Sequence, residues 1–147
     1  MESFSKNQRV KPMIGYSKRS LTEKLGIKEG FRIAILNPPQ NYAPMLGALP
    51  SGVTVDARCA TGLDLIHCFV RSRREAASAI SALKDNISSR GALWVSWPKA
   101  SSGVRTDLNE NVIREIGLKT GLVDVKVCAV DETWSGLKFV YRLKDRP

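Results

Sequence analysis

A run of six residues at 31–36 constrains the fold of this chain more than any other feature. The sequence Phe-Arg-Ile-Ala-Ile-Leu has the continuous apolar character of a strand that is buried within a parallel sheet. The run ends abruptly at Asn37-Pro38-Pro39. Three further strands are predicted, at 53–55, at 63–70, and at 92–96 with Gly91 at its start. Strands that alternate with helices predict an α/β fold with a mostly parallel sheet.

Capping signals mark the predicted helices. Ser20 and Glu23 form a capping box that opens a short helix, which Gly26 ends. Ser72 and Glu75 form a second box, before an amphipathic helix that extends to about residue 86. A short helical piece is predicted at 42–46. A last helix is predicted to have Thr106 as its N-cap, with a buried stripe made by Leu108, Val112, Ile113 and Ile116.

The spacing of apolar residues changes in the C-terminal part of the chain. Apolar and polar residues alternate over 123–129 and again over 137–141, on either side of a turn at 131–136. This pattern predicts a β-hairpin. The predicted fold is therefore a Rossmann-like three-layer sandwich, whose mostly parallel sheet has an antiparallel C-terminal hairpin at its edge. Residues 1–15 are predicted to be a flexible basic tail, and residues 16–147 to form one α/β domain.

Composition excludes several classes of protein. At 147 residues, 43% hydrophobic and 25% charged, the chain matches an ordinary globular domain. Its apolar runs are too short to span a bilayer, and its first residues lack the apolar region of a signal peptide, so we expect a cytoplasmic protein without a membrane partner. Three widely spaced cysteines and one histidine do not make a set of metal ligands, so no metal is predicted. No cofactor is predicted either.

The net charge of +9 raises the question of nucleic acid as a partner. Residues 1–32 hold eight of the basic and three of the acidic side chains, and so supply +5 of this charge. The excess is spread along the chain, without a recognisable nucleic-acid-binding motif. We therefore interpret it as a solvated basic surface, and nucleic acid is not an expected partner.

The order of elements resembles the second half of S-adenosylmethionine-dependent methyltransferase domains, in which a last helix leads into a terminal hairpin. This resemblance implies a glycine-rich loop after the first strand, where the backbone approaches the cofactor. The present chain has Asn37-Pro38-Pro39 there, and the two prolines remove two N–H donors. Asp56, after the second predicted strand, has the position of a ribose ligand. We expect that the cofactor does not bind in the usual pose.

A second resemblance covers nearly the whole chain from Tyr16 onward. The sequence is similar to a family of small bacterial proteins that is catalogued only as a domain of unknown function. The similarity implies a bacterial cytosolic protein and brings no established activity. It is carried by the runs KLGIK at 24–28, WPK at 97–99, SGV at 102–104, TDL at 106–108 and KVCAVDETWSGL at 126–137.

The predicted fold also selects a ligand-facing edge. Ligands of open parallel sheets bind beyond the carboxyl ends of the strands. This rule brings together the loops at 37–41, 56–58, 71–74, 97–106 and 131–135. The candidate ligand-binding residues from these loops are Asn37, Arg71, Trp97, Lys99, Ser102, Thr106, Asp131 and Trp134.

Each candidate has a second interpretation. The loop at 97–106 either binds an anion at a helix N-terminus or is a solvated loop before a capped helix, with a Trp97–Pro98 bond that is cis or trans. Trp134 either walls a ligand or covers the core. Arg71 and the arginines at 73–74 either hold an anion or face solvent. His67 is interpreted as a core residue, and no catalytic set can be assembled.

The leading hypothesis is a non-catalytic module that binds a small ligand or an anion on a degenerate methyltransferase-like fold. The first alternative is a protein-interaction module that dimerises through the hairpin edge. The second alternative is a methyltransferase that uses S-adenosylmethionine through an altered loop. RNA binding through the basic N-terminal segment is the last hypothesis.

Overall fold

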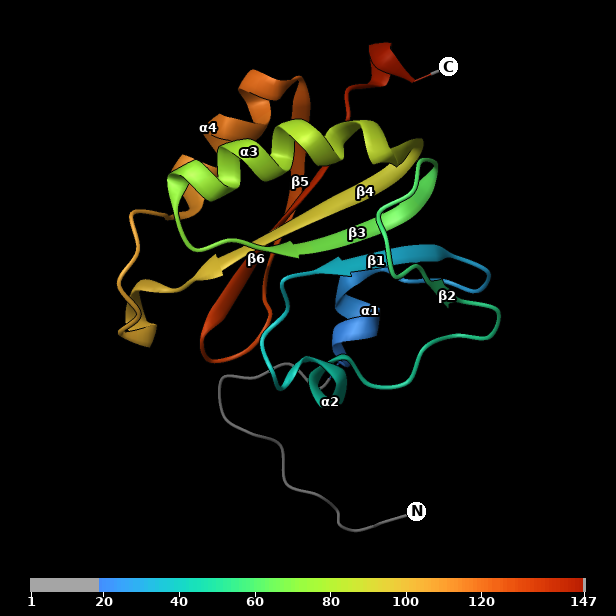
Figure 1. The fold of residues 1–147 in the computed structure, drawn as a ribbon, viewed down its shortest axis with the longest axis horizontal. Coiled ribbons are helices and arrows are strands. Elements are labelled where there is room, and N and C mark those ends of the chain that lie inside the picture. Colours follow the sequence, from blue (N-terminus) through green and yellow to red (C-terminus); the bar gives the residue numbers. More distant parts are fainter. Residues whose placement is uncertain (1–18, 147) are drawn as a thin grey trace, which may run out of the picture.

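The protein is described by a computed structural model, which covers residues 19–146 (Figure 1). The predicted tail at 1–15 lies outside these residues. One sheet of six strands, in the order β2-β1-β3-β4-β6-β5, forms the middle of the molecule. The strands are β1 (Arg32–Leu36), β2 (Thr54–Val55), β3 (Leu63–Phe69), β4 (Ile87–Pro98), β5 (Leu122–Ala129) and β6 (Trp134–Tyr141).

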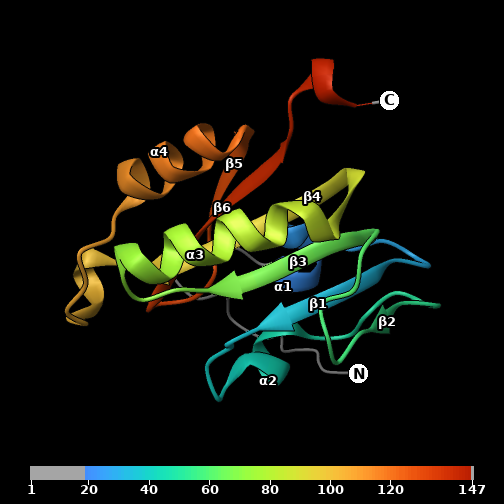
Figure 2. The ribbon, with the colours of Figure 1, turned by 45° about the horizontal axis from the view of Figure 1, so that its top comes forward.

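Helices cover both faces of the sheet. Figures 1 and 2 show α3 and α4 on one face and α1 and α2 on the other, which confirms the predicted three-layer α/β sandwich. The helices are α1 (Leu21–Leu25), α2 (Tyr42–Leu46), α3 (Arg73–Leu83) and α4 (Glu110–Thr120), and short 3-10 turns are η1 (Lys84–Asn86), η2 (Ala100–Ser102) and η3 (Leu143–Asp145).

The sheet is parallel except at β6. β1 pairs in parallel with β2 and β3, and β3 pairs in parallel with β4. β6 is antiparallel to both β4 and β5, and it lies between them. The predicted hairpin is thus confirmed, with its second strand inserted beside β4 and its first strand, β5, at the open edge.

Two hydrophobic cores lie on the two faces of the sheet. The core under α3 and α4 contains Trp97 and Phe139, and the core under α1 and α2 contains Trp94 and Trp134. Trp94 is fully buried, and its indole Nε1 donates a hydrogen bond to the Leu25 carbonyl oxygen at 2.9 Å. Side chains alternate between faces along a strand, so Trp94 and Trp97 of β4 enter opposite cores.

The predicted serines cap α1 and α3, and the predicted capping box is complete only at α1. Ser20 Oγ accepts from the Glu23 backbone N–H, and Glu23 Oε1 accepts from the Ser20 backbone N–H, so the first capping box is complete. Ser72 Oγ caps α3 by accepting from the Glu75 N–H at 3.1 Å. The Glu75 carboxylate accepts from the Arg71 N–H, one residue earlier than a capping box requires.

The prediction that Thr106 caps the last helix is wrong. α4 begins at Glu110, and its N-cap is Asn109, whose Oδ1 accepts from the Val112 N–H at 2.9 Å. The Thr106 hydroxyl instead donates to the Arg71 carbonyl oxygen at 2.7 Å. Thr106 therefore ties the loop before α4 to the loop after β3. Asp107 accepts from the Arg73 N–H, and Asn109 caps the helix.

The predicted start of the fourth strand is also wrong. β4 begins at Ile87, four residues before Gly91, so this glycine lies inside the strand. A Cβ on Gly91 would lie 2.8 Å from the Leu63 carbonyl oxygen of β3, closer than a carbon side chain can approach. The missing side chain of Gly91 therefore lets β3 and β4 approach closely, and this glycine does not mark the start of β4. Every peptide bond within the described residues is trans, including Trp97–Pro98.

Candidate functional site

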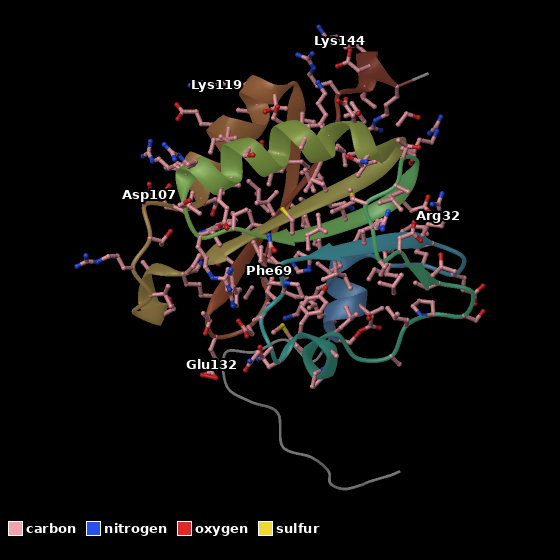
Figure 3. All side chains as sticks on the ribbon, viewed as in Figure 1. Arg32, Phe69, Asp107, Lys119, Glu132 and Lys144 are labelled. Atoms are coloured by element: carbon pink, nitrogen blue, oxygen red, sulfur yellow. The ribbon has the colours of Figure 1, made fainter. Side chains whose placement is uncertain are left out.

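The predicted ligand-facing edge is present in the fold. Because β1, β3, β4 and β5 run in the same direction, the loops that follow them lie at one edge of the sheet. Figure 3 shows Asp107 and Glu132 at this carboxyl edge and Arg32 near the opposite edge. The prediction that the loops after these strands share an edge is confirmed by the topology.

A cleft of about 520 Å³ lies at this edge beside the N-terminal half of α3. Two arginines and one carboxylate contribute its charge. Glu75 is engaged by the Arg71 N–H at 2.6 Å. Arg74 forms no ion pair with any residue in the range 19–146, so the cleft has an excess of positive charge. The lining residues are Asn37, Arg71, Ser72, Arg74, Glu75, Ser78 and Ala79.

Arg71 connects this cleft to the aromatic cluster behind it. Its guanidinium carbon lies 5.0 Å from the centre of the Trp134 ring, a cation–π contact. Trp134 is only 6% exposed, and its ring meets Phe69 edge-to-face with 5.0 Å between ring centres. Of the two interpretations of Trp134, the geometry favours the one in which the indole covers the core, and its ring also supports Arg71.

Asp131 shapes the turn of the β5–β6 hairpin. Its Oδ1 accepts hydrogen bonds from the backbone N–H groups of Thr133 and Trp134, at 2.9 and 2.8 Å. The Lys99 N–H donates to the Thr133 carbonyl oxygen at 2.7 Å, which joins this turn to the end of β4. The acidic side chain is thus explained by the turn, as expected for an Asx-type turn.

The loop between β4 and α4 satisfies its own polar groups. Ser102 Oγ donates to the Lys99 carbonyl oxygen at 2.6 Å and accepts from the Val104 N–H at 3.1 Å. The Lys99 ammonium makes no ion pair with a residue of the described range. In the predicted anion site at this loop the hydroxyls of Ser102 and Thr106 are therefore already engaged, and neither Lys99 nor Arg105 pairs with a carboxylate of the described residues.

The eight predicted ligand-binding residues do not form one pocket. Asn37 and Arg71 line the cleft, and Trp134 adjoins it through Arg71. Trp97, at 4% exposure, enters the core under α3 and α4, on the opposite face of the sheet from Trp134. Lys99, Ser102, Thr106 and Asp131 belong to the loops around the cleft and do not line it.

Arg74 and Ser78 line the cleft but were absent from the predicted site. Arg74 is one of the three arginines at 71–74 for which the sequence allows either an anion site or solvent exposure. The structure separates them, because the backbone N–H and side chain of Arg73 are held by Asp107. The spacing of Arg74 and Ser78, four residues apart on a predicted helix, was a signal that both lie on one face.

The loop after β1 does not fit the nucleotide cofactor of methyltransferases. Asn37 has φ +55°, so it adopts the left-handed conformation that a glycine would take at this turn. The following Pro38 and Pro39 have no N–H to offer to a carboxylate or ribose. The next helix, α2, has five residues and no side-chain N-cap.

The end of β2 does not fit the cofactor either. β2 ends at Val55, which pairs with Ile33 of β1. β1 continues for three more residues, to Leu36. The Asp56 carboxylate, which has the position of a ribose ligand in the fold that the sequence resembles, forms an ion pair with Arg32 at 2.9 Å. Both halves of the expected cofactor cradle are therefore altered, and no methyl-transfer step is derived from this chain.

The left-handed turn at Asn37 gives a first testable prediction. Asn37→Ala is expected to destabilise the protein by about 1 kcal/mol, because a Cβ without a local hydrogen-bonding group disfavours positive φ. Asn37→Gly is expected to be neutral to within about 0.5 kcal/mol. Urea denaturation of both variants measures the difference. Equal stability of the two variants would contradict a left-handed backbone at this position.

A buried polar network lies below the carboxyl edge. The Tyr42 hydroxyl lies 2.8 Å from His67 Nδ1, and Ser96 Oγ lies 2.7 Å from His67 Nε2. His67 and Ser96 are fully buried, and burial lowers the pKa of His67 to about 3. Burial also raises the pKa of the Tyr42 phenol. His67 is thus a neutral core histidine with both ring nitrogens satisfied, as the sequence indicated.

Solved structures place this fold among methyltransferase folds. The chain is similar to a TehB-like S-adenosylmethionine-dependent methyltransferase from Corynebacterium glutamicum, with 10% identity, a TM-score of 0.53, and coverage of 87% of this chain and 90% of that one. It is similar to magnesium protoporphyrin IX methyltransferase from Synechocystis with bound S-adenosylhomocysteine, with 13% identity, a TM-score of 0.53, and coverage of 83% and 78%. The predicted methyltransferase-like fold is confirmed.

A third similar structure carries no methyltransferase description. It is a possible exported protein from Bordetella parapertussis, with 11% identity, a TM-score of 0.58, and coverage of 82% of this chain and 65% of that one. The sequence matches no protein-family model and no curated protein. Identities this low establish the shared fold and leave the function to the residues of this chain.

Between positions 19 and 146, no group of three or more His, Cys, Asp or Glu side chains is placed to hold a metal ion. No helix of that range has the length and apolar character needed to cross a membrane.

Proposed function

We propose that the chain is a non-catalytic module that binds a small anionic ligand on a methyltransferase-like fold. The observation that carries the proposal is the cleft beside α3, which is lined by two arginines, Arg71 and Arg74, and by one carboxylate that is already hydrogen-bonded. The cleft lies where open parallel sheets bind ligands. Its volume of about 520 Å³ is within the range of small-molecule sites. We propose a bacterial cytoplasmic location, from the resemblance of the sequence.

The groups in the cleft suit a phosphate or a carboxylate. A guanidinium donates two parallel N–H bonds to such an anion, and the Asn37 amide and the Ser78 hydroxyl offer further donors. The cation–π contact with Trp134 restricts the Arg71 side chain, which lowers the entropy lost on binding. Within the described residues, the Glu75 carboxylate accepts a hydrogen bond from the Arg71 N–H, and no hydrogen bond joins it to the hydroxyl of Ser72 or Ser78.

Thermal shift with inorganic pyrophosphate tests this proposal. The ligand at 20 mM is expected to raise the Tm of the wild-type protein by a few degrees, as about 1–2 kcal/mol of binding linkage would do. Arg74→Gln should lose most of this shift. Arg90→Gln, a matched change at another exposed arginine outside the cleft, should keep it. An equal shift in Arg74→Gln and wild type, or no shift in either, would contradict the proposal.

A methyltransferase that uses S-adenosylmethionine in an altered pose is the second candidate function. The fold it shares with solved methyltransferases favours it. The prolines after Asn37 and the Asp56–Arg32 ion pair argue against the usual pose. Affinity for S-adenosylmethionine separates this candidate from the first.

The predicted dimer through the hairpin edge stays a prediction. β5 is an open edge strand, with Val125 and Val127 exposed at 55% and 46%. Its pairing with β6 shifts register between Asp124 and Lys126, and Lys126 is exposed on the strand. A bulge and a lysine are the features that usually prevent edge strands from pairing with a second chain. Light scattering at high concentration reports the oligomeric state directly.

A further inference from the structure

A cluster of lysines occupies the sheet face opposite α4. Lys126 of β5 and Lys138 of β6 are direct cross-strand partners, and Lys138 is also the partner of Trp94 in β4. The Leu25 end of α1 packs on Trp94, so these lysines extend the face beyond α1. Lys24 of α1 reaches the same place, since its Nζ donates to the Ala129 carbonyl oxygen at 3.2 Å. Lys28, which follows α1, lies close enough to Lys138 for its charge to lower the pKa of that ammonium, and we call these four residues the lysine patch.

The charge of the lysine patch is not neutralised within the described chain. None of its four ammonium groups forms an ion pair with a residue of the 19–146 range. Partial burial, together with Lys126 and Lys28, lowers the pKa of Lys138. Like charges directly opposite one another on a sheet destabilise the fold. The patch therefore gains stability from an external anion.

The N-terminal residues 1–18 do not supply this anion. Residues 1–18 contain four basic side chains and one acidic side chain, so they carry charge of the same sign as the lysine patch. Charge complementarity favours an occupant from outside the chain.

The exposed hydrophobic side chains of the described residues indicate which class of partner the lysine patch binds. The exposed large hydrophobic residues of the described chain are all aliphatic: Val55, Val104, Leu118, Val125, Val127 and Leu143. The hot spots of protein interfaces are enriched in aromatic side chains, and single-stranded nucleic acids stack on them, whereas anionic membrane surfaces attract lysines by charge, as a duplex does. A nucleic-acid duplex needs no aromatic side chains, because its phosphate backbone supplies the affinity through charge alone.

We propose that the lysine patch binds the phosphate backbone of a nucleic-acid duplex without reading its sequence. The four cations come from α1, the segment before β1, β5 and β6, and form two groups in the chain, at 24–28 and at 126–138. No local sequence pattern indicates the patch, because its lysines come together only through the pairing of β5 with β6 and the contact of Lys24 with Ala129. This surface is distinct from the cleft beside α3, and the proposal is independent of the ligand of that cleft.

Fluorescence anisotropy with a labelled 24-base-pair duplex tests the proposal. DNA and RNA duplexes of mixed sequence are titrated with the full chain between 50 and 300 mM NaCl. We expect binding whose logarithm falls with log salt at a slope near −3 to −4, since about 0.9 is lost for each of four phosphate contacts. Lys28→Gln with Lys126→Gln should weaken binding at 100 mM salt at least tenfold and reduce the slope by about 2.

A matched variant separates the patch from net charge. Lys119→Gln with Lys144→Gln removes the same charge, and Figure 3 labels both residues on the side of α4 and the C-terminal turn. This variant should bind within twofold of wild type. All four substituted lysines are exposed, and circular dichroism confirms folding. The proposal is overturned if wild type does not bind at 50 mM salt, if the matched variant loses as much affinity, or if phosphatidylglycerol vesicles bind and duplexes do not.

Discussion

Acidification from pH 7.5 to pH 5 is expected to remove about 2 kcal/mol from the free energy of unfolding, through His67 alone. Burial lowers the pKa of His67 to about 3 in the folded state, whereas an unfolded histidine has a pKa near 6.5. The unfolded chain therefore takes up a proton below pH 6.5, and the folded chain does so only near pH 3. Stability is complete above pH 6.5 and falls by a total of about 4 kcal/mol by pH 3.

The chain is favourable for this measurement because His67 is its one histidine. Carboxylates with ordinary pKa values titrate below pH 5, so the window from pH 7.5 to pH 5 isolates the imidazole. Urea denaturation at pH 7.5, 6.5, 5.5 and 5.0 gives the free energies. A stability that is flat across this range would contradict a neutral, buried His67.

A triple variant provides the control for the His67 network. Tyr42→Phe, His67→Leu and Ser96→Ala remove the donors and acceptors together, so no polar group is left unsatisfied. We expect the pH dependence between 7.5 and 5 to disappear in this variant, with a stability at pH 7.5 within about 2 kcal/mol of wild type. His67→Leu alone should cost more than the triple variant, because it leaves two buried hydroxyls without partners.

Gly117→Ala is expected to destabilise the protein by about 2–3 kcal/mol, although the same change in an exposed helix stabilises by nearly 1 kcal/mol. Gly117 lies on the buried face of α4 against the Phe139 ring of β6. A Cβ there would overlap ring atoms Cε1 and Cζ and would lie 2.7 Å from Cδ1. Because Phe139 is fully buried, its ring has no open space to enter.

A second-site change tests the cause of this destabilisation. Phe139→Leu shortens the side chain that the new methyl group meets, so the double variant should be more stable than the sum of the single effects by at least about 1 kcal/mol. Leu118→Ala, at an exposed position of the same helix, should change stability by less than about 0.5 kcal/mol. Urea midpoints measure all four proteins. Gly117→Ala with wild-type stability would show that α4 is not packed on β6 at this position.

The order of the elements could be predicted because each depends on local patterns. The apolar run at β1, the capping residues of α1 and α3, and the period-two alternation of β5 and β6 identified their elements. The direction of the strands followed from the helices between them, and the carboxyl edge followed from that direction. Local chemistry and general rules of α/β folds were sufficient for these features.

The candidate site could not be predicted in the same way, because it depends on long-range pairing. Trp97 lies near the end of β4 and Trp134 begins the neighbouring strand β6, yet the register that pairs Pro98 with Trp134 directs the two indoles to opposite faces. Thr106 is able to cap a helix, but its bond to the Arg71 carbonyl oxygen assigns it elsewhere. The lysine patch likewise exists only after β5 and β6 pair. No local pattern carries this information.

We propose that the loop after β1 has lost the ability to hold a nucleotide-type methyl donor, and that the cleft beside α3 binds an anion instead. Calorimetric titration of the full chain with S-adenosylmethionine tests this claim most directly. We predict no saturable heat up to 1 mM ligand. Saturable binding with a micromolar Kd that is weakened by substitutions at Asn37 would contradict it.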